Sequence, residues 1–68
     1  MTMGTELALE LDPWFVTMAG GVVIQINAVG YSEEDDQYVF SALVKGSPNY
    51  EITVAKVPKR VVESIRGG

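Results

Sequence analysis

Four consecutive acidic residues are the densest group of chemically capable side chains in this 68-residue sequence. Carboxylate oxygens attract hard cations, but a calcium loop needs oxygens at alternating positions, a glycine and a distal glutamate. The run Glu33-Glu34-Asp35-Asp36 has neither that spacing nor the glycine. We therefore expect a solvated loop or a helix start, and as a functional surface a candidate docking patch for a basic partner.

The sequence contains no histidine and no cysteine. Without them the usual catalytic triads, zinc sites and disulfides cannot be assembled. Gly20-Gly21 lacks the third glycine and the strand-to-helix setting of a dinucleotide site, and is expected to form a hairpin turn. We predict a protein that is not an enzyme, with no catalytic residues, no metal site and no cofactor.

Two aromatic residues, Trp14 and Phe15, follow Pro13 directly. Neighbouring side chains of a strand point to opposite faces, so one ring should enter the core and the other should face outward. The outward ring would pack against a second copy or bind a partner. Trp14 and Phe15 are therefore candidate partner-binding residues.

The net charge of −4 is unevenly distributed. Residues 1–55 carry eight acidic residues and one lysine, which gives −7, whereas residues 56–68 carry four basic residues and one glutamate, which gives +3. The acidic body would repel a phosphate backbone, which argues against nucleic acid as a partner. The candidate contact residues of the basic end are Lys56, Lys59, Arg60 and Arg66.

Sixty-eight residues suffice for one domain, residues 1–68, and we expect residues 1–5 and 67–68 to be flexible. A core of this size rarely supplies more than about 3–5 kcal/mol, and neither disulfides nor metals are available here. Because 47% of the residues are hydrophobic, association should supply the rest, so we predict a homo-oligomer or a protein partner. No apolar run approaches the roughly 20 residues of a membrane span, so we predict no membrane contact and, by default, a cytoplasmic location.

The sequence of the first half of the chain predicts strands. Alternation in Glu6–Leu11 predicts a strand, Asp12-Pro13 a tight corner, and Trp14–Met18 a second strand. Ala19–Gly21 is typical of a turn, and Val22–Val29 is the clearest strand of the sequence.

The segment Ser32–Lys45 has two interpretations. As a charged hairpin tip followed by a strand, it would place Tyr38, Phe40, Ala42 and Val44 on one face. As a helix, it would use Ser32 as the N-cap with acidic residues in the first turn. The β-prone interior favours the strand, and the helix stays open as the alternative.

The sequence then predicts a turn at Gly46–Asn49, a strand at Tyr50–Ala55 and a short element that begins at Pro58. The expected fold is all-β (mainly β), a small five-stranded barrel with a short C-terminal 3-10 or α element. If Ser32–Lys45 were helical, the alternative would be an α+β fold of the β-grasp type.

Three resemblances to known families fit parts of this pattern. Val57-Pro58 followed by Val62 and Ile65 resembles the closing segment of Src-homology-3-like (SH3-like) barrels, and Met18–Gln25 resembles their diverging turn. This resemblance implies a small barrel. More weakly, Met18–Ile26 is similar to the second strand of the carbon storage regulator family, which implies an interwoven dimer that binds RNA.

The end of the sequence, Ile65-Arg66-Gly67-Gly68, resembles the tail of ubiquitin-like modifiers and sulfur carriers, which implies a reactive C-terminal carboxylate. We predict a non-enzymatic protein–protein interaction module, such as an adaptor, regulator or inhibitor subunit. A ubiquitin-like or sulfur-carrier protein and a small RNA-binding regulator are the alternatives.

Overall fold

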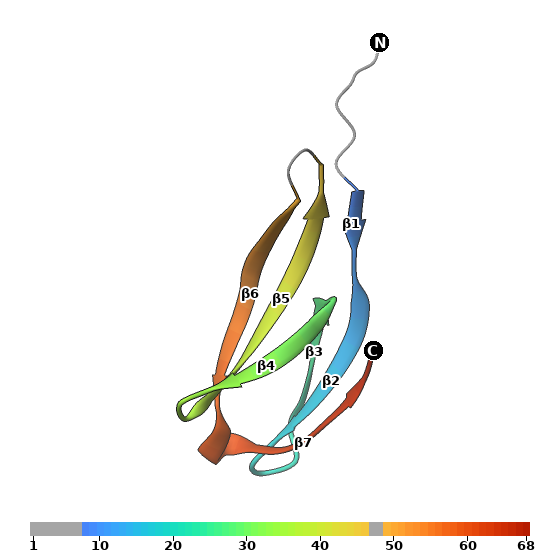
Figure 1. Cartoon of the computed structure of the whole chain (residues 1–68). Helices are drawn as coiled ribbons and strands as arrows, with labels where there is room; N and C mark the ends of the chain where they lie inside the picture. Colours follow the sequence, from blue (N-terminus) through green and yellow to red (C-terminus); the bar gives the residue numbers. More distant parts are fainter. Residues whose placement is uncertain (1–7, 47–48) are drawn as a thin grey trace.

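The computed structural model describes residues 8–46 and 49–68, which form two antiparallel sheets (Figure 1). Sheet A contains β1, β4, β5 and β6, and sheet B has the strand order β3-β2-β7. The predicted mainly β class is confirmed. The elements are β1 (Ala8–Glu10), β2 (Asp12–Met18), β3 (Val23–Ala28), β4 (Gly30–Glu34), β5 (Gln37–Lys45), β6 (Tyr50–Pro58), the 3-10 turn η1 (Lys59–Val61) and β7 (Val62–Gly67).

The long strand β5 organises sheet A. β6 pairs along nearly its whole length, whereas β4 pairs with its first half and β1 with its last residues. The ladder between β5 and β6 shifts register between Phe40 and Ser41, which leaves Val54 of β6 as the extra residue of a β-bulge.

Two stretches of chain pass from one sheet into the other without a loop. Leu11 alone separates β1 from β2, and Val29 alone separates β3 from β4. The predicted corner at Asp12-Pro13 is wrong, because both residues belong to β2 and Pro13 lies opposite Asn27. Proline excludes a helix interior but is compatible with extended backbone near the start of a strand. Of the strand predicted over residues 6–11, residues 6 and 7 lie outside the described residues.

The turn predicted at Ala19–Gly21 is confirmed. The Gly21 N–H donates to the Met18 carbonyl at 2.9 Å, and Gly20 and Gly21 have φ angles of 94° and 91°. Such angles favour glycine, which has no Cβ. In the turn predicted at Gly46–Asn49, residues 47 and 48 lie outside the described residues.

The segment from Ser32 to Lys45 belongs to the β4–β5 hairpin, so the strand interpretation is right. The helix alternative is wrong, and with it the β-grasp fold, since no α-helix occurs in residues 8–46 and 49–68. Burial of Phe40 and Ala42 on one face of β5 explains the outcome. Burying one large apolar side chain is worth about 1.5–3 kcal/mol, against roughly 1 kcal/mol for an N-cap at Ser32.

The predicted five-stranded barrel is corrected in two respects. The described residues form more than five strands, and the two sheets do not close into a barrel, because β6 and β7 lie in different sheets without pairing. The short C-terminal 3-10 element is confirmed, with Pro58 at the N-cap of η1. Nowhere in residues 8–46 and 49–68 is there a helix of the length and hydrophobicity that a membrane span requires.

A single small core lies between the sheets. Val16 of β2, Ala28 of β3, Phe40 of β5 and Val57 of β6 are buried and in mutual contact. The β5–β6 hairpin and β1 extend past sheet B (Figure 1), and apolar side chains such as Tyr50 are exposed. The partly buried side chains packed against the core are Trp14, Met18, Ile26, Tyr38, Ala55, Val61, Val62 and Ile65.

Candidate partner-binding surface

An aromatic cluster joins the two sheets. The ring of Tyr31 lies edge-on to Trp14, with centroids 5.3 Å apart, and edge-on to Tyr38 at 5.7 Å. Trp14 also contacts Phe40, and its indole N–H donates to the Ala28 carbonyl at 3.1 Å. Trp14 is thus the ring that enters the core, with its polar atom satisfied. Tyr31, which is 40% exposed, presents the cluster to solvent.

The acidic run lies where β4 turns into β5, beside η1. Lys59 Nζ donates to Glu33 Oε1 at 2.8 Å, and the Lys59 backbone N–H donates to the Asp36 carbonyl. The hydrogen bond to Glu33 raises the pKa of Lys59 above its ordinary value. Glu34, Asp35 and Asp36 are exposed and form no ion pair within the described ranges. One residue of the basic end therefore neutralises one of the four carboxylates.

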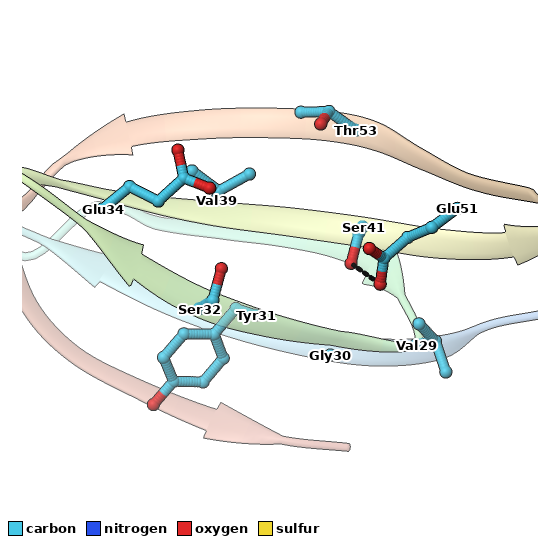
Figure 2. A pocket seen from close by; sticks show the side chains of 9 residues that line it. All are labelled: Val29, Gly30, Tyr31, Ser32, Glu34, Val39, Ser41, Glu51 and Thr53. Carbon is cyan, nitrogen blue, oxygen red and sulfur yellow. Dashed lines mark hydrogen bonds between the residues drawn. The ribbon is translucent and has the colours of Figure 1, made fainter.

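The outer face of sheet A contains a half-open hollow of about 340 Å³ (Figure 2). Val39 of β5 is buried at its base, and the carboxylates of Glu34 and Glu51 lie toward its opposite ends. The Ser41 hydroxyl donates to Glu51 Oε2 at 3.3 Å, which orients that carboxylate. The lining residues are Val29, Gly30, Tyr31, Ser32, Glu34, Val39, Ser41, Glu51 and Thr53.

This arrangement suits a long cationic side chain. An aliphatic stem can lie over Val39 while the charged head reaches Glu34 or Glu51, with hydroxyl groups between them. Glu34 and Glu51 contribute −2 at the hollow, Lys56, opposite Val39, contributes +1, and the exposed Asp35 and Asp36 of the adjoining turn add −2, so the hollow and this turn together carry −3. Such a face attracts cations and repels phosphates.

The outward aromatic ring lies elsewhere. Phe15 is exposed on the outer face of sheet B, where it lies opposite Gln25 of β3 on one side and Arg66 of β7 on the other. Trp14 and Phe15 thus point to opposite faces, as predicted. Because Phe15 lies on sheet B, the structure does not bring it together with the acidic turn.

The basic end does not form one patch. Lys56 lies on β6 opposite Val39, Lys59 pairs with Glu33, and Arg66 lies beside Phe15 on sheet B. Arg60 is exposed in η1. A nucleic-acid site that uses all four basic residues would have to span both sheets.

Gly67, the last residue of β7, and the following Gly68 pack closely on β2. Gly67 lies opposite Trp14, and the Gly68 N–H donates to the Pro13 carbonyl at 3.2 Å. A Cβ at Gly67 would collide with the Pro13 carbonyl oxygen, and one at Gly68 would come within 2.8 Å of the Trp14 ring. Glycine is required at these positions for packing, whatever else the pair does.

Several residues of the hollow were not predicted. Ser32, Ser41, Glu51 and Thr53 are small or polar side chains in strands, and nothing in their types suggests a site. Their signal lay in period-two alternation, which puts Ser32 with Glu34 on one face of β4 and Glu51 with Thr53 on one face of β6. The hollow itself depends on strand pairing, which alternation alone does not supply.

Within residues 8–46 and 49–68, no three acidic, histidine or cysteine side chains group closely enough to hold a metal ion. Comparison with protein-family models, curated proteins and solved structures finds no match to this chain. The resemblance to Src-homology-3-like barrels is therefore supported only as far as a small fold of two antiparallel sheets.

Proposed function

We propose that the chain is a non-enzymatic protein–protein interaction module that binds a basic segment of a partner on the outer face of sheet A. The hollow over Val39, with Glu34 and Glu51 toward its opposite ends, is the observation that carries the proposal. In this role the protein acts as an adaptor, regulator or inhibitor subunit.

The chemistry of the face defines the partner segment. A lysine or arginine side chain of the partner lies along Val39, with its charge at Glu34 or Glu51. The neighbouring carboxylates Asp35 and Asp36 raise the local concentration of basic segments and accelerate their association. Each exposed ion pair contributes only about 0.2–1 kcal/mol, so the affinity is modest and weakens with salt.

The test is titration of the protein with a fluorescent arginine-containing basic peptide at low and at physiological ionic strength. The variant E34Q/E51Q keeps the shape of the hollow and removes its charges, so we expect affinity to fall roughly 2- to 30-fold, the equivalent of two exposed ion pairs. An acidic peptide of equal length should not bind.

The matched control is E63Q, which neutralises an exposed glutamate of β7 in sheet B. It removes one negative charge, as each single substitution in the hollow does, and should leave peptide affinity close to that of the wild type. If E63Q weakens binding as much as one of the substitutions in the hollow does, only net charge matters and the proposed site is wrong. If no basic peptide binds at low salt, the proposed function is wrong.

A further inference from the structure

The edge strand β3 differs from the rest of the surface in having no charge. No acidic or basic residue occurs between Asp12 and Glu33, so all of β3 and its preceding turn are uncharged. Val22 is 61% exposed and Val23 55%, and Ile24 is also exposed. A contiguous stretch of exposed β-branched residues at a sheet edge is a template for pairing with another strand.

The free backbone groups of β3 can be assigned from its pairing with β2. The Met18 N–H donates to the Val22 carbonyl, and antiparallel ladders use alternate residues, so Val22, Ile24 and Ile26 direct their backbone groups to β2. Val23 and Gln25 therefore direct theirs away from β2. β3 is the terminal strand of sheet B, and no residue of the described ranges pairs with this edge.

The other sheet edges carry features that discourage pairing. β6 has a β-bulge at Val54, the charges of Glu51 and Lys56, and Pro58 at its end. β4 carries two glutamates, and β7 carries Glu63 and Arg66. Bulges, charges and prolines are the devices by which proteins protect edge strands. β3 has none of these.

We propose that two copies of this chain associate through antiparallel pairing of their β3 strands. The occupant is a second copy: each copy carries −4, and at this uncharged edge two copies can pair without bringing like charges face to face. The three strands of sheet B then continue into those of the second copy. This inference uses a different surface from the proposed peptide site and does not depend on it.

The two-fold symmetry of such a pair fixes which residues meet. A two-fold axis perpendicular to the sheet places residues of the same face opposite each other. Val29 already bonds to Ser41, so the free part of the edge is its beginning, and the axis passes near Ile24. Val23 then lies opposite Gln25 of the second copy, and Ile24 opposite Ile24. This pairing covers apolar side chains that one copy alone leaves exposed.

The test uses sedimentation velocity of the wild type and of two double variants, V23E/Q25E and V23K/Q25K. Both positions are exposed and lie on the outer face, so either variant should fold, as checked by circular dichroism. In each variant like charges face one another across the axis, and we expect the dimer to weaken by about tenfold or more. An equimolar mixture of the two variants should restore the dimer, because opposite charges then face each other.

The matched control is V54E, which places a charge on the other long exposed edge, β6, at a valine that is 42% exposed. It should leave the dimer unchanged. A wild type that stays monomeric up to millimolar concentration overturns the proposal. So does a mixture of the two double variants that stays monomeric, or a V54E variant that dissociates the dimer.

Discussion

Sheet A exposes charge on its face, whereas sheet B exposes uncharged backbone at its edge. The outer face of sheet A carries Glu34 and Glu51 around its hollow, next to the exposed acidic turn. The edge of sheet B is β3, which has no charged residue and directs free N–H and C=O groups outward. In one small chain, the two sheets present opposite kinds of exposed surface.

The difference follows from how the chain distributes residues between the two sheets. β3 and β4 are one stretch interrupted only at Val29, yet the first half is uncharged and the second ends in Glu33 and Glu34. The stretch crosses from sheet B to sheet A at Val29, so the charges appear only after the chain has entered sheet A. A charged face suits a basic segment and gives a salt-dependent contact, while an uncharged edge suits a second strand.

The largest effect on stability is expected for F40A, because both sheets share the core that contains Phe40. Phe40 has no exposed surface and contacts Trp14 of sheet B. We expect a loss of about 3–5 kcal/mol in the free energy of unfolding, which would unfold most of so small a domain. Chemical denaturation followed by the fluorescence of Trp14, the sole tryptophan, measures it.

Y50A is the control for F40A, since Tyr50 is exposed at the far end of sheet A. It should change the free energy of unfolding by no more than about 0.5 kcal/mol. Equal effects of F40A and Y50A would mean that the sheets do not share the core described here.

A smaller effect, confined to sheet B, is expected for G67A. Gly67 has a φ angle of 121° and no room for a Cβ beside the Pro13 carbonyl. We expect a loss of about 1–3 kcal/mol, measured by chemical denaturation, because β7 must shift from β2. G30A is the control, since a Cβ at Gly30 would meet open space.

G67A also bears on the carrier alternative. A carrier uses its diglycine as a flexible reactive end, so its activity would depend on Gly67 and Gly68 while its fold would not. If G67A leaves stability unchanged, the packing of β7 described here is wrong and the carrier alternative gains support.

The sequence predicts the local features of this molecule better than its tertiary features. The turn at Gly20-Gly21, the strand over residues 22–29 and the opposite faces of Trp14 and Phe15 follow from turn chemistry and alternation alone. The segment from Ser32 to Lys45 remained open because its capping signals and its β-prone interior compete, and burial of Phe40 decides between them.

The candidate surface was less predictable because it depends on tertiary packing. Glu33 and Lys59 are 26 residues apart, and only the packing of η1 against the hairpin turn brings them together. The hollow needs the pairing of β4, β5 and β6 in one register. Alternation predicts faces but not which strands are neighbours, so the acidic turn could be predicted and the hollow beside it could not.

The smallest expected effect concerns the ion pair between Lys59 and Glu33, which joins the basic end to the acidic turn. The hydrogen bond from Lys59 to Glu33 raises the pKa of Lys59, so the folded state stabilises the charged form of this lysine. The stabilisation is complete below the ordinary lysine pKa and is lost as pH rises through the higher folded-state pKa. The free energies of unfolding of wild type and K59Q should therefore differ near neutral pH and converge in the alkaline range. E33Q, which replaces the carboxylate by a neutral amide, should also weaken this pH dependence, whereas K56Q, which changes a lysine of β6 on the outer face, should retain it. A K59Q variant that differs from wild type equally at neutral and alkaline pH would show that Lys59 acts through packing on Tyr38 rather than through its charge.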